Sequence, residues 1–258
     1  NIIRGHIDTD ASLTKVIPTQ GMKSSPHLDF AGDIKFESSF PIFHASKIND
    51  VATARYAIQA GKLDMVGMTR AHIADPYIVK KIINGRENTI RPCVGATYCL
   101  DRIYEGNEAL CIHNPATGRE KIIPHEISTK ANQKKKIAIV GAGPSGLEAA
   151  KVCSERGHEV IVFEASNIAG GQLNLITRSE RRKDMLGIID WRIEACKENN
   201  VTFHYNTFAT KDIILKESPN CVIIATGGIP NTNILEEGSE FACSTWDILS
   251  GNINIEED

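Results

Sequence analysis

The sequence carries little excess charge and contains no long apolar run. Its 29 Lys and Arg against 32 Asp and Glu leave a net charge of −3, whereas a nucleic-acid-binding protein usually shows a strong basic excess. No stretch approaches the ~20 apolar residues that span a bilayer. The first residues also lack the pattern of a signal peptide. We therefore expect neither nucleic acid nor a membrane as a partner, and we predict a cytoplasmic location.

Cysteine is present in an odd number, seven. Cys93, Cys99 and Cys111 fall within one short tract, Arg91–Arg119. Without a secretory signal, this grouping favours metal or redox chemistry over a disulfide framework. The other cysteines lie on predicted elements or near the tail, and we interpret them as core or incidental residues: Cys153, Cys196, Cys221 and Cys243.

The length of 258 residues suggests one or two domains. We divide the chain into residues 1–90, 91–133 and 134–258, with a polar, basic stretch before the last part. The chain begins with Asn and ends in an acidic run, which we interpret as an internal piece of a longer polypeptide.

The sequence of residues 1–90 predicts parallel strands joined by helices. The expected elements are a strand end at 1–7, strands at 40–45 and 63–68, and helices at 50–60 and 76–84. A β-α-β-α order implies a parallel sheet. Residues 8–39 are rich in Pro, Gly, Ser and Asp, and we predict a long connection there.

The last part contains a dinucleotide-binding fingerprint. A predicted strand at 137–140 enters Gly141-Ala-Gly-Pro-Ser-Gly146, and a predicted helix at 145–156 leaves it. Gly141 permits the tight turn, Gly143 admits a pyrophosphate, and Gly146 allows close packing of helix on strand. Phosphates would bind at the helix N-terminus, where Pro144 and Ser145 lie. The alternative is a glycine turn of an ordinary α/β domain.

An acidic residue follows the second strand of this part. Glu164 ends the predicted strand 159–164, 23 residues after Gly141. Its carboxylate would accept hydrogen bonds from ribose hydroxyls and repel a 2′-phosphate. A helix at 180–199 and strands at 201–205 and 221–225 complete a Rossmann-like α/β domain.

Arg70 follows the strand at 63–68. In a (β/α)₈ barrel the loops after the last two strands build a phosphate site, and arginine can clamp a phosphate with two hydrogen bonds. Arg70 is therefore either a ligand of a phosphorylated cofactor or a surface arginine near a strand end.

The cysteine spacing Cys93-x5-Cys99-x11-Cys111 leaves three interpretations open. The thiolates hold an iron–sulfur cluster, they hold zinc together with His113, or they are buried free cysteines.

Several segments resemble known flavoenzyme families. LDMVGMTRAHIADP, residues 63–76, resembles the last strand and loop of the old yellow enzyme barrel, where such an arginine binds the FMN phosphate. The resemblance implies the C-terminal end of a (β/α)₈ TIM barrel, with FMN contacts from Ala45, Ser46, Met68, Thr69 and Arg70. Gly170-Gly171-Gln172 and Ala225-Thr226-Gly227-Gly228 resemble FAD-dependent reductases, and they imply FAD or ADP at Gly171, Gln172, Ala225, Thr226 and Gly227.

The order of barrel end, cysteine tract and dinucleotide fold is similar to that of the trimethylamine dehydrogenase and 2,4-dienoyl-CoA reductase family. Its four cysteines, spaced C-x2-C-x2-C-x11 or x12-C, hold a [4Fe-4S] cluster. Cys93, Cys99 and Cys111 match the first, third and fourth positions, and Ala96 occupies the second. The resemblance implies a metal site of these three cysteines, with a [4Fe-4S] or [3Fe-4S] cluster. The amino-acid sequence of the tract most resembles an N-methylproline demethylase-like branch of this family.

From this resemblance we expect an NADH:flavin oxidoreductase-type enzyme that oxidatively demethylates a small N-methylated amine. Electrons would pass between FMN, the cluster and an FAD-type domain, with NAD(P)H or an electron-transfer protein as partner and a homo-oligomer as a possible assembly. The alternatives are an NAD(P)H-dependent enoyl reductase and a non-catalytic nucleotide-binding module. The catalytic residues are not identified by the sequence.

Overall fold

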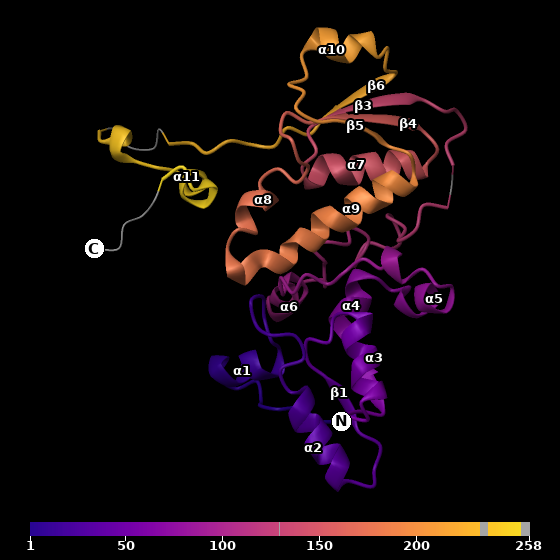
Figure 1. The fold of residues 1–258 in the computed structure, drawn as a ribbon, viewed down its shortest axis with the longest axis vertical. Coiled ribbons are helices and arrows are strands. Elements are labelled where there is room, and N and C mark those ends of the chain that lie inside the picture. Colours follow the sequence, from indigo (N-terminus) through magenta and orange to yellow (C-terminus); the bar gives the residue numbers. More distant parts are fainter. Residues whose placement is uncertain (129, 233–236, 254–258) are drawn as a thin grey trace. The chain divides into compact units, whose positions relative to one another are not determined.

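The computed structural model describes residues 1–128, 130–232 and 237–253. The chain forms two compact units, Asn1–Glu126 and Ile127–Asp258, and both belong to the predicted α/β class (Figure 1). Within the described residues, the helices are too short or too polar to cross a bilayer.

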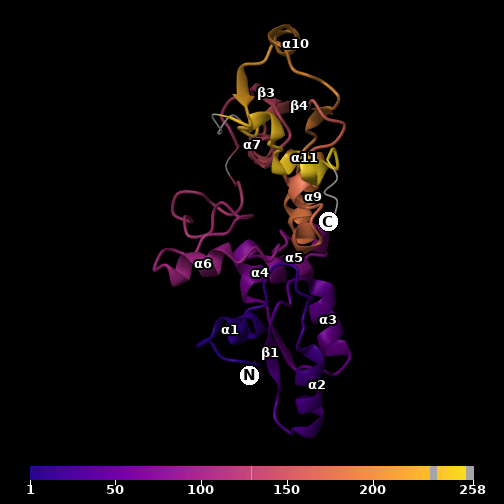
Figure 2. The same cartoon turned by 90° about the vertical axis from the view of Figure 1, so that its left-hand side faces the viewer.

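The first unit is built from short elements around two parallel strands. Its elements are α1 (Asp10–Val16), α2 (Leu28–Glu37), β1 (Phe43–Ala45), α3 (Val51–Gln59), β2 (Met65–Gly67), α4 (Thr69–Ala74), α5 (Ile78–Ile83), a 3₁₀ turn (Glu87–Thr89) and α6 (Tyr98–Tyr104). β1 pairs with β2 in parallel, and an isolated parallel bridge joins Ile2 to His44. Helices α1 and α3 lie on opposite sides of β1 (Figures 1 and 2). The parallel pairing confirms the order predicted for this part.

The core of the first unit lies between the strands and helices α2 and α3. Its buried side chains are Leu28, Ala31, Ile42, Ile48, Ala57 and Leu63. The carboxylate of Asp64 adds a polar tie, because it accepts a hydrogen bond of 2.7 Å from the backbone N–H of Ile42. This tie holds the start of β1 beside the start of β2.

The prediction of a long connection at residues 8–39 is wrong, because the segment forms α1 and α2. Thr9 caps α1 by accepting a hydrogen bond from the backbone N–H of Ser12. Leu28 and Ala31 of α2 are buried in the core. The many Pro, Gly and Ser residues lie largely between the helices and not throughout the segment.

The second unit is a four-stranded parallel sheet in the order β5-β4-β3-β6. Its elements are β3 (Lys136–Val140), α7 (Pro144–Glu155), β4 (Glu159–Phe163), α8 (Leu173–Ile176), a 3₁₀ helix (Glu180–Leu186), α9 (Gly187–Glu198), β5 (Thr202–His204), α10 (Lys211–Lys216), β6 (Cys221–Ile224), a 3₁₀ turn (Ser239–Phe241) and α11 (Thr245–Ser250). Helices α7 and α9 lie on one face of the sheet and α10 on the other (Figure 1). This is the predicted Rossmann-like arrangement, although the helix expected at 180–199 begins as a 3₁₀ helix.

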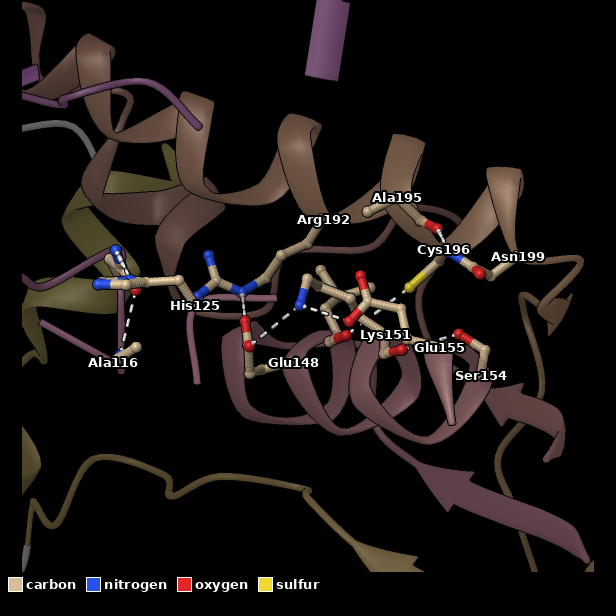
Figure 3. Close-up of polar contacts among 12 residues, drawn as sticks. Ala116, His125, Glu148, Lys151, Ser154, Glu155, Arg192, Ala195, Cys196 and Asn199 are labelled. Carbon is tan, nitrogen blue, oxygen red and sulfur yellow. Dashed lines mark hydrogen bonds and ion pairs between the residues drawn. The ribbon is translucent and has the colours of Figure 1, made fainter. Parts of the chain in front are cut away.

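Helices α7 and α9 are joined by buried charges (Figure 3). Glu148 of α7 accepts a hydrogen bond of 2.8 Å from Nε of Arg192 on α9, and its other oxygen lies 3.7 Å from Nζ of Lys151. Cys196 donates from Sγ to the backbone oxygen of Leu147 at 3.7 Å. Burial raises the pKa of Cys196 to about 12, so this thiol stays protonated and acts as a core residue, as predicted.

Candidate cofactor sites

All three cysteines of the tract line one cavity in the first unit. Cys93 precedes α6, Cys99 lies within α6, and Cys111 lies after it. The wall of the cavity also includes Ala96 and Arg70. The fold therefore brings together three thiols that span 18 positions (111 − 93) and an arginine that lies 23 positions before Cys93 (93 − 70).

Each of the three thiols receives a backbone hydrogen bond. These bonds run from Gly95 to Cys93, from Leu100 to Cys99, and from His113 to Cys111, the last at 3.4 Å. Amide donors directed at sulfur stabilise a thiolate and are among the features that tune cysteine-ligated clusters. The backbone of the tract is thus arranged to support negatively charged sulfur.

Burial acts in the opposite direction on two of these thiols. It raises the pKa of Cys93 and of Cys99, while the guanidinium of Arg70 partly opposes the rise at both. Thiols with raised pKa values are protonated at neutral pH, and a metal must displace those protons on binding. A metal bound by these two thiols would therefore release protons.

The loop that carries Ala96 has an unusual backbone. Gly95 and Thr97 both have positive φ, at 68° and 57°. A β-branched residue in this region is a real outlier, and such strain gathers at functional sites. Thr97 is secured by its hydroxyl, which donates to the backbone oxygen of Ala96 at 2.8 Å. These two residues hold Ala96 at the cavity wall.

Helix α4 anchors both ends of the cysteine tract. Asp75, its C-cap, accepts a hydrogen bond of 2.8 Å from the backbone N–H of Arg91. On the far side of the tract, the Thr117 hydroxyl donates at 2.8 Å to the backbone oxygen of Ile73, and Asn114 donates at 3.0 Å to that of Ala74. The sequence prediction missed α4 and these anchors. The one feature of the sequence that indicated the end of this helix was Asp75, which directly precedes Pro76.

The cysteines share the cavity without meeting at a single point. Among the residues that the structure describes, no three His, Cys, Asp or Glu side chains converge closely enough to hold one metal ion. A tetrahedral zinc site needs its ligands within ~2.0–2.3 Å of one centre. A cluster is larger than an ion and takes thiolates that are farther apart, so the donor set suits a cluster better than preformed zinc.

The predicted FMN residues lie at the carboxyl ends of β1 and β2. Ala45 pairs with Gly67, and a Cβ on Gly67 would lie 2.7 Å from the Cβ of Ala45. Ser46 follows Ala45, and its buried hydroxyl has no hydrogen-bond partner among the described residues. Met68 and Thr69 follow Gly67. A buried donor without a partner at this edge fits a phosphate oxygen.

Arg70 lies within a helix and not directly at the end of the strand. The strand ends at Gly67, and Arg70 is the second residue of α4. Its Nη1 donates to the backbone oxygen of Pro18 at 2.8 Å. The side chain also lines the cysteine cavity, so the residue expected at the phosphate borders the sulfur site as well.

Lys47 was missed by the sequence prediction. It follows Ser46, is buried, and has a φ of 49°. Its Nζ donates to the backbone oxygens of Thr19, at 3.0 Å, and of Met22. The only sequence signal was a cation next to a predicted cofactor residue. Lys47 adds a second positive charge at the end of this two-stranded sheet.

The glycines of the fingerprint have the geometry that a dinucleotide turn needs. A Cβ on Gly146 would lie 1.9 Å from the backbone oxygen of Gly141, and one on Gly141 would lie 2.5 Å from that of Ala225. Gly143 is the N-cap of α7, and a Cβ there would meet nothing within 4 Å. Gly143 thus faces open space at the helix N-terminus, where a pyrophosphate binds.

Glu164 fixes this turn from the end of β4. One carboxylate oxygen accepts from the backbone N–H of Ala142 at 2.7 Å, and the other accepts from that of Ser166 at 2.9 Å. Each carboxylate oxygen can accept a further hydrogen bond. Glu164 therefore supports the turn and still has capacity for ribose hydroxyls.

The two other glycine-rich segments, 170–172 and 225–228, lie beside the turn at the carboxyl ends of the strands. A Cβ on Gly171 would lie 3.3 Å from Cα of Gly143, and Gln172 donates to the backbone oxygen of Gly228 at 2.9 Å. The structure thus places the predicted nucleotide residues at the carboxyl ends of β3, β4 and β6: Gly141, Gly143, Pro144, Ser145, Gly146, Glu164, Gly171, Gln172, Ala225, Thr226 and Gly227.

Comparison with known protein families matches residues 139–193 to the family described as an NAD(P)-binding Rossmann-like domain. Over 252 residues the chain is 62% identical to a probable N-methylproline demethylase of Rhizobium meliloti, covering 98% of this chain and 37% of the relative. It is 47% identical to a multifunctional alkene reductase/demethylase of Caballeronia cordobensis, covering 97% of the chain and 36% of the relative.

A solved structure, of a 2-naphthoyl-CoA reductase complex, superposes with a TM-score of 0.85 at 32% identity, covering 92% of this chain and 36% of the other. The chain therefore spans little more than a third of each relative's length. Similarity at this level across nearly the whole chain indicates common descent with a segment of these oxidoreductases. Over nearly its whole length this chain is thus similar to a segment of relatives that include a probable N-methylproline demethylase and an alkene reductase/demethylase.

Proposed function

We propose that the chain forms the redox-connecting segment of a flavin-dependent demethylase. In this proposal the whole protein oxidises an N-methylated amine and passes electrons between FMN, an iron–sulfur cluster and an FAD or ADP-binding unit. NAD(P)H or an electron-transfer protein is the redox partner. The segment supplies the cluster ligands, part of the FMN phosphate site and the dinucleotide site.

The observation that carries this proposal is the shared cavity of Cys93, Cys99 and Cys111. Three thiols, each with an amide donor, border one space in a segment anchored at both ends. Free cysteines buried for packing alone do not need such a set of donors. Cys196 illustrates the contrast, since its thiol is itself the donor to a backbone oxygen.

When bound, an iron–sulfur cluster supplies one-electron transfer, and its potential depends on hydrogen bonds to sulfur and on nearby charge. The chain's own residues hold it through the three thiolates. The backbone N–H groups of Gly95 and His113 stabilise the sulfur charge. Ala96 contributes no ligand, so one side of the site is left to a non-protein ligand.

At the FMN phosphate, we assign Ser46 and Arg70 as donors, with main-chain contacts from Ala45, Met68 and Thr69. The unpartnered buried hydroxyl of Ser46 supports this assignment. Lys47 contributes positive charge beside them. Arginine and lysine side chains bind phosphate through charge-assisted hydrogen bonds.

At the second nucleotide, the turn 141–146 receives the pyrophosphate and Glu164 receives the ribose. The open space above Gly143 supports the first role, and the remaining acceptor capacity of Glu164 supports the second. A negative carboxylate here disfavours a ribose 2′-phosphate. FAD or ADP therefore fits better than NADP.

The substrate class rests on the names of two relatives, both of which include demethylase. An enoyl or enone reductase is the second candidate, because one of those names includes alkene reductase and the superposed structure is a 2-naphthoyl-CoA reductase. The reductase would consume NAD(P)H, whereas the demethylase would release formaldehyde from a methylated amine.

The decisive experiment is cofactor analysis of the anaerobically purified full-length protein. We expect about three or four irons per chain, together with FMN and FAD or ADP, and formaldehyde release from N-methylproline. Cys99→Ala should lose the iron, while the control Cys221→Ala, at an exposed position, should retain it. Zinc in place of iron, or iron that survives Cys99→Ala, would contradict the proposed cluster.

A further inference from the structure

Arg70 was expected at the FMN phosphate, yet its side chain borders the cysteines. Arg70 and Ile73 lie three residues apart on α4 and both line the cavity, since residues at this spacing share a helix face. The adjacent side of the helix is buried in the unit, with Ala71 and Ala74 at most 1% exposed. The face of α4 that carries Arg70 and Ile73 therefore forms one wall of the cysteine cavity.

The position of Arg70 is fixed by more than its own helix. Its Nη1 donates to the backbone oxygen of Pro18 at 2.8 Å, which leaves the other guanidinium N–H groups available to neighbours. The segment that includes Pro18 is also bonded to the cysteine tract, because Gln20 donates to the backbone oxygen of Val94 at 3.5 Å. A substitution at Arg70 would thus change the cavity without removing a thiol.

Charge makes this position consequential. Cys93, Cys99 and Cys111 are the thiols of the cavity wall, and Arg70 is the residue of that wall with a permanent positive charge. Binding a metal turns the thiols into three anions in a partly buried space, where charges interact more strongly than in water. A fixed cation lowers the cost of gathering them and favours the reduced, more negative state of a bound cluster.

We infer that Arg70 is a positioning and electrostatic partner of the three-cysteine site, in addition to its assigned role at the flavin phosphate. This inference deepens the proposed function and rests on it for the identity of the metal. The fixed charge of Arg70 at the cavity wall would set a bound cluster at a higher reduction potential. Together with its assigned role at the flavin phosphate, its place in the cavity wall lets one side chain serve both cofactors.

The test must separate the two roles of Arg70, so it uses flavin-free protein. Arg70→Gln removes the charge, and Arg70→Lys keeps it without the planar fork. Arg55→Gln is the matched control, because Arg55 is an arginine of the same unit that pairs with Glu87 at the surface. The midpoint potential of the cluster is measured by an EPR-monitored redox titration in each flavin-free variant.

We expect Arg70→Gln to shift the midpoint potential downwards, Arg70→Lys to restore most of the shift, and Arg55→Gln to match the parent protein. Metal-free protein reconstituted with ferrous iron and sulfide should also retain less iron in Arg70→Gln than in Arg55→Gln, because residues next to metal ligands affect metal affinity by about tenfold or more. Circular dichroism establishes that each variant is folded.

Equal potentials and equal iron contents after reconstitution in Arg70→Gln and Arg55→Gln would overturn the inference, even if Arg70→Gln lost FMN. That result would confine Arg70 to the phosphate. If the parent protein held no iron even after reconstitution, the proposed function would fail, whereas a parent that holds the cluster with no difference between the two variants would refute only the inference about Arg70. The two failures are therefore distinguishable.

Discussion

The carboxylate of Glu164 accepts a hydrogen bond of 2.7 Å from the backbone N–H of Ala142, the residue between the first two glycines of the turn. The second oxygen accepts from the backbone N–H of Ser166. A carboxylate 22 residues away (164 − 142) thus holds the turn in place before any nucleotide binds. An acid predicted as a ribose ligand is also a structural part of the phosphate-binding turn.

Glu164→Gln should therefore lower both stability and nucleotide content. An amide presents one oxygen in place of two, so one buried N–H loses its acceptor, at a cost of about 1–3 kcal/mol. Urea unfolding followed by circular dichroism measures the stability, and absorbance of the released nucleotide measures content. The control is Glu159→Gln, at the exposed start of β4. Unchanged stability in Glu164→Gln would contradict the structural role.

Two glycines of the turn should respond differently to alanine. In Gly146→Ala the Cβ would lie 1.9 Å from the backbone oxygen of Gly141, so the turn must open and the second unit should lose both stability and nucleotide. In Gly143→Ala the Cβ meets nothing within 4 Å, and stability should change by less than about 0.5 kcal/mol. Nucleotide binding should still fall, because the methyl group occupies the phosphate approach.

Thermal unfolding and isothermal titration with ADP give the two readouts for this pair. Normal ADP affinity in Gly143→Ala would remove the turn from the nucleotide site. Normal stability in Gly146→Ala would contradict the close approach of α7 to the turn. The pair thus separates a packing glycine from a binding glycine.

The sequence predicted the second unit well because its signals are local. A buried strand, a glycine turn and a helix occur in immediate succession from Lys136 to Glu155, and each reports the same supersecondary unit. The first unit was predicted less completely. Residues 8–39 were predicted as a connection because short helices with few buried side chains leave only a weak periodic pattern of apolar residues.

The cysteine site shows a different limit of sequence reasoning. The grouping of Cys93, Cys99 and Cys111 was visible, but the anchors Asp75 and Thr117 were not, since they act through backbone atoms of distant residues. A hydrogen bond between a side chain and a remote backbone leaves no spacing pattern in the sequence.

Glu148 should prove important for the stability of the second unit. It lies between the buried cations Arg192 and Lys151, whose side chains are 5% and 7% exposed. Glu148→Ala removes the carboxylate that Arg192 binds, while Lys151 keeps Glu155 at 3.0 Å, and the change should cost about 3 kcal/mol. The control Glu194→Ala breaks an exposed pair with Lys197 and should cost under about 1 kcal/mol. Equal urea midpoints in the two variants would contradict the role of Glu148.

His44 should make the stability of the first unit depend on pH. The residue is 1% exposed, its Nδ1 lies 2.8 Å from the backbone oxygen of Ile2, and burial lowers its pKa. A histidine with a lowered folded pKa contributes stability that is fully present above its unfolded pKa of about 6.5. The contribution is lost as the pH falls below that value, because the unfolded chain then binds the additional proton.

The measurement is the urea midpoint at pH values from 7.5 down to 5.5, a range chosen to cross about 6.5. The midpoint should fall with pH in the parent protein and fall less steeply in His44→Gln, although that variant is less stable overall. His72→Gln, at an exposed position of α4, should keep the parent's slope. Parallel slopes in the parent and in His44→Gln would show that His44 is not responsible.

Ala96→Cys should complete the cysteine site. Ala96 lines the same cavity as the three thiols, and Gly95 and Thr97, with their positive φ angles, hold it there. If the proposed cluster is present, a fourth thiolate would supply a ligand for the iron position at which the parent chain offers no cysteine. We expect iron content to rise towards about four per chain, and the [3Fe-4S] EPR signal formed on exposure to air to weaken. Ala96→Ser adds an oxygen of similar size without a thiolate and should retain the parent's air sensitivity. If the cysteine variant lost iron in air as readily as the serine variant, Ala96 would not occupy a ligand position.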